Sequence, residues 1–186
     1  MSLLRFCEWL ASTRGSIAIH ESLWGYPVLE SVHVLALFLF VGMAATLGLR
    51  LLGVTMRHTP VSDVMGQLLP WTVAGFAVMV VSGVLLFYAI PVRTYQSIFF
   101  RAKAIMLISA GANIWVFHNT VYRRIAEWDL DPVPPRMARV AGGLSLVLWA
   151  CIIILGRMIA YDWFDCDKQP QRAIINVLAG CATDSR

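Results

Sequence analysis

The four histidines are the side chains of this sequence best suited to bind a metal or a cofactor. His20 and His33 lie near the start of the first long apolar segment, His58 follows that segment, and His118 lies near the end of the third. Neutral imidazole is a common metal ligand and an axial ligand of haem iron. An imidazole facing hydrocarbon is costly, so we expect His33 to face the interior of a helix bundle, where it has a partner.

Depth separates His33 from His118. Their two segments cross the membrane in the same direction, and counting from the segment starts at 1.5 Å per residue places the two rings about 20 Å apart. One haem therefore cannot use both. We predict two sites, one near each membrane face: His33 with His20 or Met106, and His118 with His58.

Basic side chains near each site suit an anionic cofactor. A b-type haem needs one or two axial ligands and basic groups for its propionates. On the outer side these groups are Arg101, Lys103 and Arg157, and on the inner side they are Arg50 and Arg123. The predicted cofactor is haem b, with one or two copies, and the alternatives are copper or no cofactor. Copper suits histidine with methionine, and three methionines line the apolar segments: Met43, Met79 and Met106.

Simpler roles stay open for the same side chains. His33 has Glu30 three residues earlier as a hydrogen-bond partner on the same helix face. His118 lies near an interface where water or Asn119 can bind it, and His58 reads most simply as a loop residue. Methionines at helical spacing are usually core residues.

Composition places the chain in the bilayer. Of the 186 residues, 59% are hydrophobic and 14% are charged, and the mean hydropathy is +0.70, which indicates an integral membrane protein. The net charge of +4 comes from basic residues in loops, so we read it as a topology signal and expect a lipid bilayer, and no nucleic acid, as partner.

The elements that must position these side chains are four apolar segments, at residues 27–53, 67–90, 97–122 and 135–161. Each is long enough to span a bilayer, and the short loops between them favour an up-down-up-down bundle. The predicted fold is therefore all-α and integral to the membrane: a four-transmembrane-helix up-down bundle.

An N-terminal amphipathic helix precedes this bundle. Leu3, Phe6, Cys7 and Leu10 fall at helical spacing, which is typical of a helix lying on the membrane surface. We predict one membrane domain over residues 1–186, made of an interfacial helix (1–20), the bundle (27–161) and an extracytoplasmic tail (162–186).

Basic residues predict the orientation. Two loops, after the first segment and between the third and fourth, are rich in arginine and should be cytoplasmic, which leaves both termini outside. Cys166 and Cys181 then lie on the oxidising side, and we predict a disulfide between them, the alternative being two free thiols.

Several runs resemble known families. HESLWGYPVLESVHVLALFLFVG, LLPWTVAGFAVMVVSGVLLFYAIP, FFRAKAIMLISAGANIWVFHNTVYRR and IAYDWFDCDK look like a family of small bacterial inner-membrane proteins of unknown function, over nearly the whole chain. More distantly, HVLALFLFVGMAATLGLR and RAKAIMLISAGANIWVFH are similar to two helices of the CopD copper-resistance membrane domain. They are also similar to HemJ, a haem-binding protoporphyrinogen oxidase, whose important His and Lys would correspond to His33 and Lys103.

These observations lead to competing functions. The first is a b-type cytochrome-like protein of the bacterial inner membrane, which carries electrons between a quinone or a periplasmic redox partner and the other membrane face. The second is an accessory subunit of a larger membrane complex, or a copper-handling, CopD-like protein without redox catalysis. A membrane enzyme related to HemJ is the third.

Overall fold

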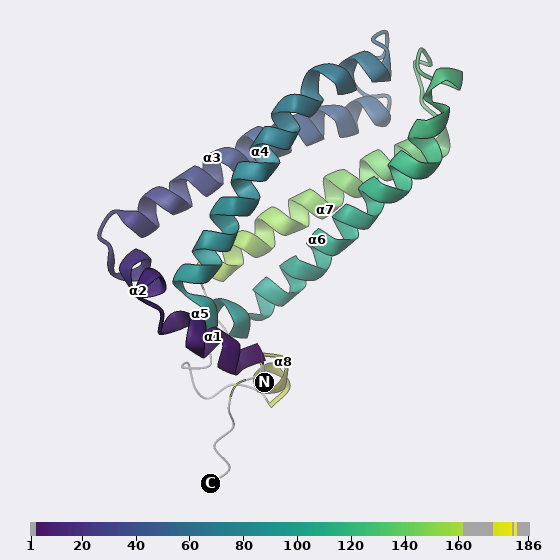
Figure 1. Cartoon of the computed structure of the whole chain (residues 1–186). Coiled ribbons are helices and arrows are strands. Elements are labelled where there is room, and N and C mark those ends of the chain that lie inside the picture. The colour runs from purple at the N-terminus through teal and green to yellow at the C-terminus, as the bar shows by residue number, and fades with distance from the viewer. Residues whose placement is uncertain (1–2, 162–172, 180, 182–186) are drawn as a thin grey trace.

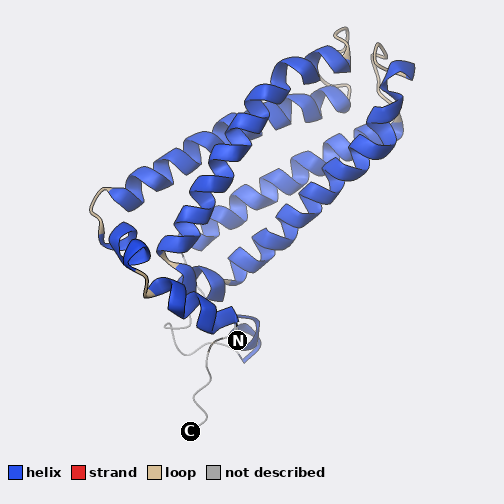
Figure 2. Cartoon of the chain, viewed as in Figure 1, coloured by secondary structure: helices blue, strands red, loops and turns tan. Residues whose placement is uncertain are grey.

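The structure is a computed structural model that describes residues 3–161, 173–179 and 181, and its described regular structure is entirely helical (Figure 2). The described residues form eight α-helices: α1 (Leu3–Ala11), α2 (Arg14–Glu21), α3 (Gly25–Leu51), α4 (Val61–Ala89), α5 (Pro91–Gln96), α6 (Ile98–Val116), α7 (Arg136–Tyr161) and α8 (Ala173–Ala179). A π-helical turn, η1 (Phe117–Val121), and a 3-10 turn, η2 (Tyr122–Glu127), follow α6.

Four helical segments in the described residues are long and apolar enough to cross a membrane: α3, α4, α6 with η1 and η2, and α7. The protein is thus an all-α, multi-pass membrane protein, as the sequence predicts. Consecutive spans run in opposite directions. In Figure 1 the spans lie side by side as one elongated bundle, with α1, α2, α5 and α8 gathered at one end. We call this end the collar end, and the opposite end, with loops 52–60 and 128–135, the loop end.

Two span boundaries differ from the sequence prediction, and for the first of them the structure shows a tertiary reason. α4 begins at Val61 rather than at 67, because the Asp129 carboxylate accepts bonds from the Ser62 backbone N–H (2.8 Å) and hydroxyl (2.5 Å) at the helix start. The third span keeps α-helical geometry only to Val116, after which it widens to the π turn and then tightens to the 3-10 turn.

The N-terminal segment also differs, because it forms two helices instead of one. The helix is interrupted at Ser12 and Thr13. The Thr13 hydroxyl accepts a hydrogen bond from the Ser16 N–H at the start of α2. The Thr13 hydroxyl also bonds the Tyr88 hydroxyl at 2.7 Å, and Ser16 donates to the Tyr88 carbonyl at 2.8 Å. These contacts dock α2 on the collar end of α4.

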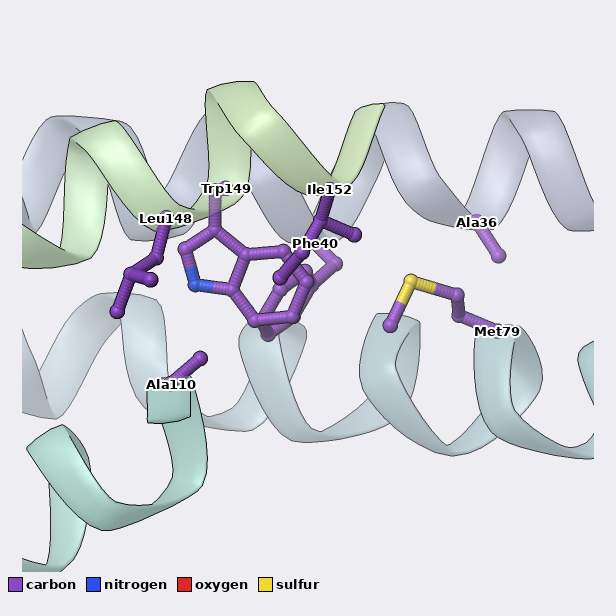
Figure 3. Packing of buried hydrophobic residues seen from close by; sticks show 7 residues of the cluster. All are labelled: Ala36, Phe40, Met79, Ala110, Leu148, Trp149 and Ile152. Carbon is purple, nitrogen blue, oxygen red and sulfur yellow. The ribbon is translucent and has the colours of Figure 1, made fainter. Parts of the chain in front are cut away.

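The main hydrophobic core lies midway along the spans and takes side chains from all of them (Figure 3). Phe40 of α3 packs edge-on against Trp149 of α7, with ring centroids 4.5 Å apart and planes at 70°. Met79 of α4 and Ala110 of α6 complete the contact. α3 packs against both α4 and α7, and α7 also packs against α6. In order of packing contact, the spans are therefore α4, α3, α7 and α6.

At the loop end, Arg50 joins the two interhelical loops. Its side chain is fully buried, its Nε donates to the Thr59 carbonyl (3.0 Å) and its Nη2 donates to the Asp131 carbonyl (3.2 Å). A charged donor satisfies carbonyls that the loop leaves unpaired, so Arg50 fixes loop 52–60 against loop 128–135.

The closest approach of α3 and α7 depends on glycine. A Cβ on Gly142 would lie 2.8 Å from the Leu51 Cβ and 2.9 Å from the Gly48 carbonyl oxygen, whereas a Cβ on the adjacent Gly143 would meet only the Leu52 Cδ2, at 3.5 Å. Neither the Leu51 Cβ nor the Gly48 carbonyl oxygen can be moved away by a side-chain rotation. Small residues let transmembrane helices approach in this way.

We therefore expect Gly142→Ala to push α7 away from α3 and to lower the free energy of unfolding by about 1–3 kcal/mol, the usual cost of overpacking. Gly143→Ala is the matched control and should leave stability unchanged. Thermal unfolding of both variants in the same detergent measures the difference. Equal stabilities would contradict the packing of α3 on α7 described above.

Candidate functional site

A layer of polar and glycine residues lies one helical turn from the main core, toward the collar end. His33 of α3 precedes Ala36 by three residues, and Ser82 of α4 follows Met79 by three. On the other two spans, Lys103 of α6 precedes Met106 by three residues and Gly156 of α7 follows Ile152 by four. We call these residues, together with Gly83, the polar layer. All four spans thus contribute to it.

The histidine of this layer bonds to a neighbouring helix. Its Nδ1 lies 3.0 Å from the Ser82 Oγ, and the Ser82 hydroxyl lies 2.6 Å from the Val78 carbonyl, to which it donates. Since a carbonyl can only accept, the single hydroxyl proton is used there, and His33 Nδ1 must be the donor to Ser82.

This hydrogen bond determines which nitrogen of His33 is available. A neutral imidazole that carries its proton on Nδ1 keeps the lone pair on Nε2. Histidines that bind metals usually donate their other ring N–H to a fixed acceptor, which sets both the tautomer and the ring orientation. Ser82, which is 2% exposed, supplies such an acceptor. In this tautomer Nε2 is the nitrogen of His33 that could act as a ligand.

Glycines on the neighbouring helices leave space for the His33 and Lys103 side chains. A Cβ on Gly83 would lie 3.2 Å from the His33 Cε1, so the imidazole lies directly against the backbone of α4. A Cβ on Gly156 would lie 3.4 Å from the Lys103 Nζ, so the ammonium lies against α7. Both groups thus point into the bundle rather than toward lipid.

The charge of the layer is positive. The Lys103 ammonium and, more weakly, the Glu30 carboxylate act electrostatically on His33. Glu30 is exposed, and Lys103 is half-buried with no hydrogen bond or ion pair to any residue that the structure describes. An ammonium within a membrane span is costly, so Lys103 is a candidate functional residue that would suit an anionic ligand.

The other residues predicted for the outer site lie elsewhere. His20 is exposed in the last turn of α2, and Met106 packs against the main core. Arg157 is exposed, donates to the Tyr161 hydroxyl (3.0 Å) and lies over the Tyr161 ring. Arg101 donates to backbone carbonyls of α8. The structure therefore brings together His33 and Lys103 of this predicted set.

The residues predicted for the inner site lie at the loop end. His118, in the π turn, is exposed and stacks on Tyr122 with ring centroids 5.1 Å apart, and His58 is exposed in loop 52–60. Arg50 is used by the two loop carbonyls, and Arg123 donates to the Asn119 side chain. No group of three His, Cys, Asp or Glu side chains suited to a metal ion occurs among the described residues.

The predicted disulfide falls partly outside the described residues. Cys181 is disulfide-bonded, whereas its predicted partner, Cys166, lies outside the described part of the chain. Cys7 and Cys151 are free thiols.

Sequence reasoning missed two members of the layer, Ser82 and Gly156. A signal was available in their depth, because counting residues from the collar end of each span places them near His33. His33 is eight residues from Gly25, Ser82 is seven from Ala89, and Gly156 is five from Tyr161. The sequence gives no comparable indication of how each helix is rotated about its axis, and this rotation decides which side chains face inward.

The bond from His33 to Ser82 yields a direct test. We expect ¹⁵N solid-state NMR of the bilayer-embedded protein to show His33 as the neutral Nδ1–H tautomer, with the signal assigned by its loss in His33→Ala. Ser82→Ala should lower the free energy of unfolding by about 1 kcal/mol. The matched control is Ser109→Ala, because Ser109 also bonds the carbonyl four residues back (2.9 Å) but has no histidine beside it in the described structure. An Nε2–H tautomer, or equal losses in both serine variants, would refute the assignment.

Comparison of the chain with known protein families gives a match. Residues 6–162 match a family described as a family of unknown function, DUF6644. No curated protein and no solved structure matches the chain. These comparisons do not show the resemblance to CopD or HemJ. The match spans most of the sequence and includes all four spans, so the protein belongs to the DUF6644 family, a family of four-helix membrane proteins of unknown function.

Proposed function

We propose that the polar layer binds one b-type haem through His33 and that the protein carries electrons within the membrane. The observation that carries the proposal is the hydrogen bond from His33 Nδ1 to the buried Ser82 hydroxyl, because it leaves Nε2 free and oriented. Haem supplies one-electron redox chemistry when it is bound, and the chain supplies the ligand, the charge and the dry surroundings.

The residues of the layer fit haem better than a bare metal ion. Haem carries two propionates, and the Lys103 ammonium is a cation without an acidic partner in the described structure. A copper ion would instead be repelled by that ammonium. Met79 and Met106, the methionines one turn deeper, pack with the core residues around Phe40 and Trp149. Glycine at position 83 preserves the position of the ligand, because a Cβ there would lie 3.2 Å from the His33 Cε1.

Each residue of the layer has a separate task in this proposal. His33 ligates the iron, Ser82 holds the tautomer and the ring plane, and Lys103 pairs with a propionate. The apolar core below the layer, around Phe40 and Trp149, keeps water from the site, which is the means by which burial tunes a haem potential.

The proposal includes an orientation. Arg57, Arg123, Arg124 and Arg136 lie at the loop end, which makes that end cytoplasmic in a bacterial inner membrane. The collar end and the polar layer are then near the extracytoplasmic side, where a quinone or a periplasmic redox protein exchanges electrons with the haem. The exposed positions of His118 and His58 give no comparable support to a second haem, so the proposal takes one.

Haem content tests the ligand. Protein expressed with ample haem and purified in detergent should contain about one haem per chain by pyridine haemochrome. His33→Ala should contain none, because the iron then loses its oriented imidazole, whereas His118→Ala should match the unaltered protein. A protein without a Soret band, or equal haem loss in both variants, would exclude this proposal.

Lys103 is tested by affinity. Replacing a charge-assisted contact costs about 1.5–3 kcal/mol, so Lys103→Met should weaken haem binding roughly 10- to 100-fold in a titration of the apoprotein. Arg14→Met also removes one positive charge at the collar end, from an exposed position of α2, and should leave the affinity unchanged. Equal affinities for Lys103→Met and the unaltered protein would remove Lys103 from the site.

A further inference from the structure

The short helix α8 is attached to the bundle by Arg101. The Arg101 guanidinium donates to the carbonyls of Leu178 and Ala179, the last of these at 3.0 Å, and these are the final carbonyls of α8. A cation at a helix C-terminus also complements the helix dipole. The Ala179 side chain is fully buried, so this end of α8 is packed against the protein.

The position of Arg101 sets the depth of α8. Arg101 is in the first turn of α6, which is where the third span enters the membrane. Its guanidinium lies 5.0 Å from the centroid of the Tyr95 ring, and its Nε donates to the Tyr95 carbonyl at 3.3 Å. Tyrosine and arginine at the end of a span are typical of the membrane–water interface. α8 therefore lies at the level of that interface.

The side of α8 away from the bundle is apolar and uncovered. Ile174, Val177 and Leu178 are spaced by three and one residues, which places them on one helix face, and they are 71%, 76% and 53% exposed. α1, also at the collar end, has the same character: Leu3, Phe6 and Trp9 are 67%, 49% and 61% exposed. Both faces continue the apolar surface that the spans present to lipid.

We infer that α8 is an interfacial anchor, whose face of Ile174, Val177 and Leu178 lies in the acyl-chain boundary of the bilayer and whose depth is set by Arg101. The partner of this face is lipid, because the helix is fixed at the depth where acyl chains begin. Arg101 thereby has a structural task that is distinct from the propionate contact predicted from the sequence. The inference is independent of haem binding.

The depth can be measured with nitroxide labels on the full chain in nanodiscs. Cys7→Ala and Cys151→Ala remove the free thiols, and Val177→Cys then carries the label. Collisions with oxygen, which partitions into lipid, are compared with collisions with a water-soluble nickel chelate. Phe38→Cys, at a 72% exposed position in the middle of α3, is the lipid reference. His58→Cys, in the exposed loop 52–60, is the water reference.

We expect the oxygen-to-nickel collision ratio at Val177 to lie above that at His58 and below that at Phe38, because the ratio falls from the bilayer centre toward the headgroups. Nickel access equal to that at His58 would show a water-facing helix and overturn the inference. Low access to both reagents would show a protein surface on this face, a second copy or another subunit, and would overturn it equally.

A second measurement tests the role of Arg101. Arg101→Ala releases the α8 carbonyls and should raise nickel access at Val177 at least twofold, whereas Arg14→Ala, which also removes a charge at the collar end, should not. Circular dichroism verifies that both variants keep the helical bundle. Unchanged access in Arg101→Ala would show that Arg101 does not set the depth of α8.

Discussion

Hydrocarbon offers no hydrogen bonds, and this constraint governs the whole structure. Backbone groups in the spans are satisfied within helices. Most hydroxyls in the spans return to the carbonyl four residues back on their own helix, as Ser31 does to Pro27, Thr72 to Leu68 and Ser109 to Ile105. A polar side chain that instead forms a hydrogen bond to another helix identifies a contact specific to the tertiary structure.

Two cross-helix bonds stand out within the spans. Asn113 donates to the Ala141 carbonyl at 3.0 Å and ties α6 to α7. His33 bonds Ser82 and ties α3 to α4. The donor in the first contact is an amide N–H, and an amide nitrogen offers no lone pair to a metal. The imidazole differs, because its second nitrogen is left with an unshared pair beside an ammonium that also lacks a partner in the described structure.

The sequence was sufficient for the spans and insufficient for the contacts between them. Apolar length predicts α3 and α7 to within two residues at each end. It misplaces the start of α4, because Asp129, far along the chain, caps that helix. For His33 the sequence offered Glu30 as the nearby hydrogen-bond partner. The bond is instead to Ser82, on another helix, and the rotation of one helix against its neighbour depends on packing that no local pattern encodes.

The packing order of the spans has a consequence for how the site is assembled. α3 with α4 and α6 with α7 are two hairpins of consecutive helices, and contacts between α3 and α7 join them. The imidazole and its acceptor serine both belong to the first hairpin, whereas the lysine and the glycine that accommodates it belong to the second. During synthesis the first hairpin can therefore orient His33 before the second has emerged from the ribosome. Lys103 joins His33 only when the second hairpin docks on the first. The polar layer is therefore complete only after all four spans have packed together.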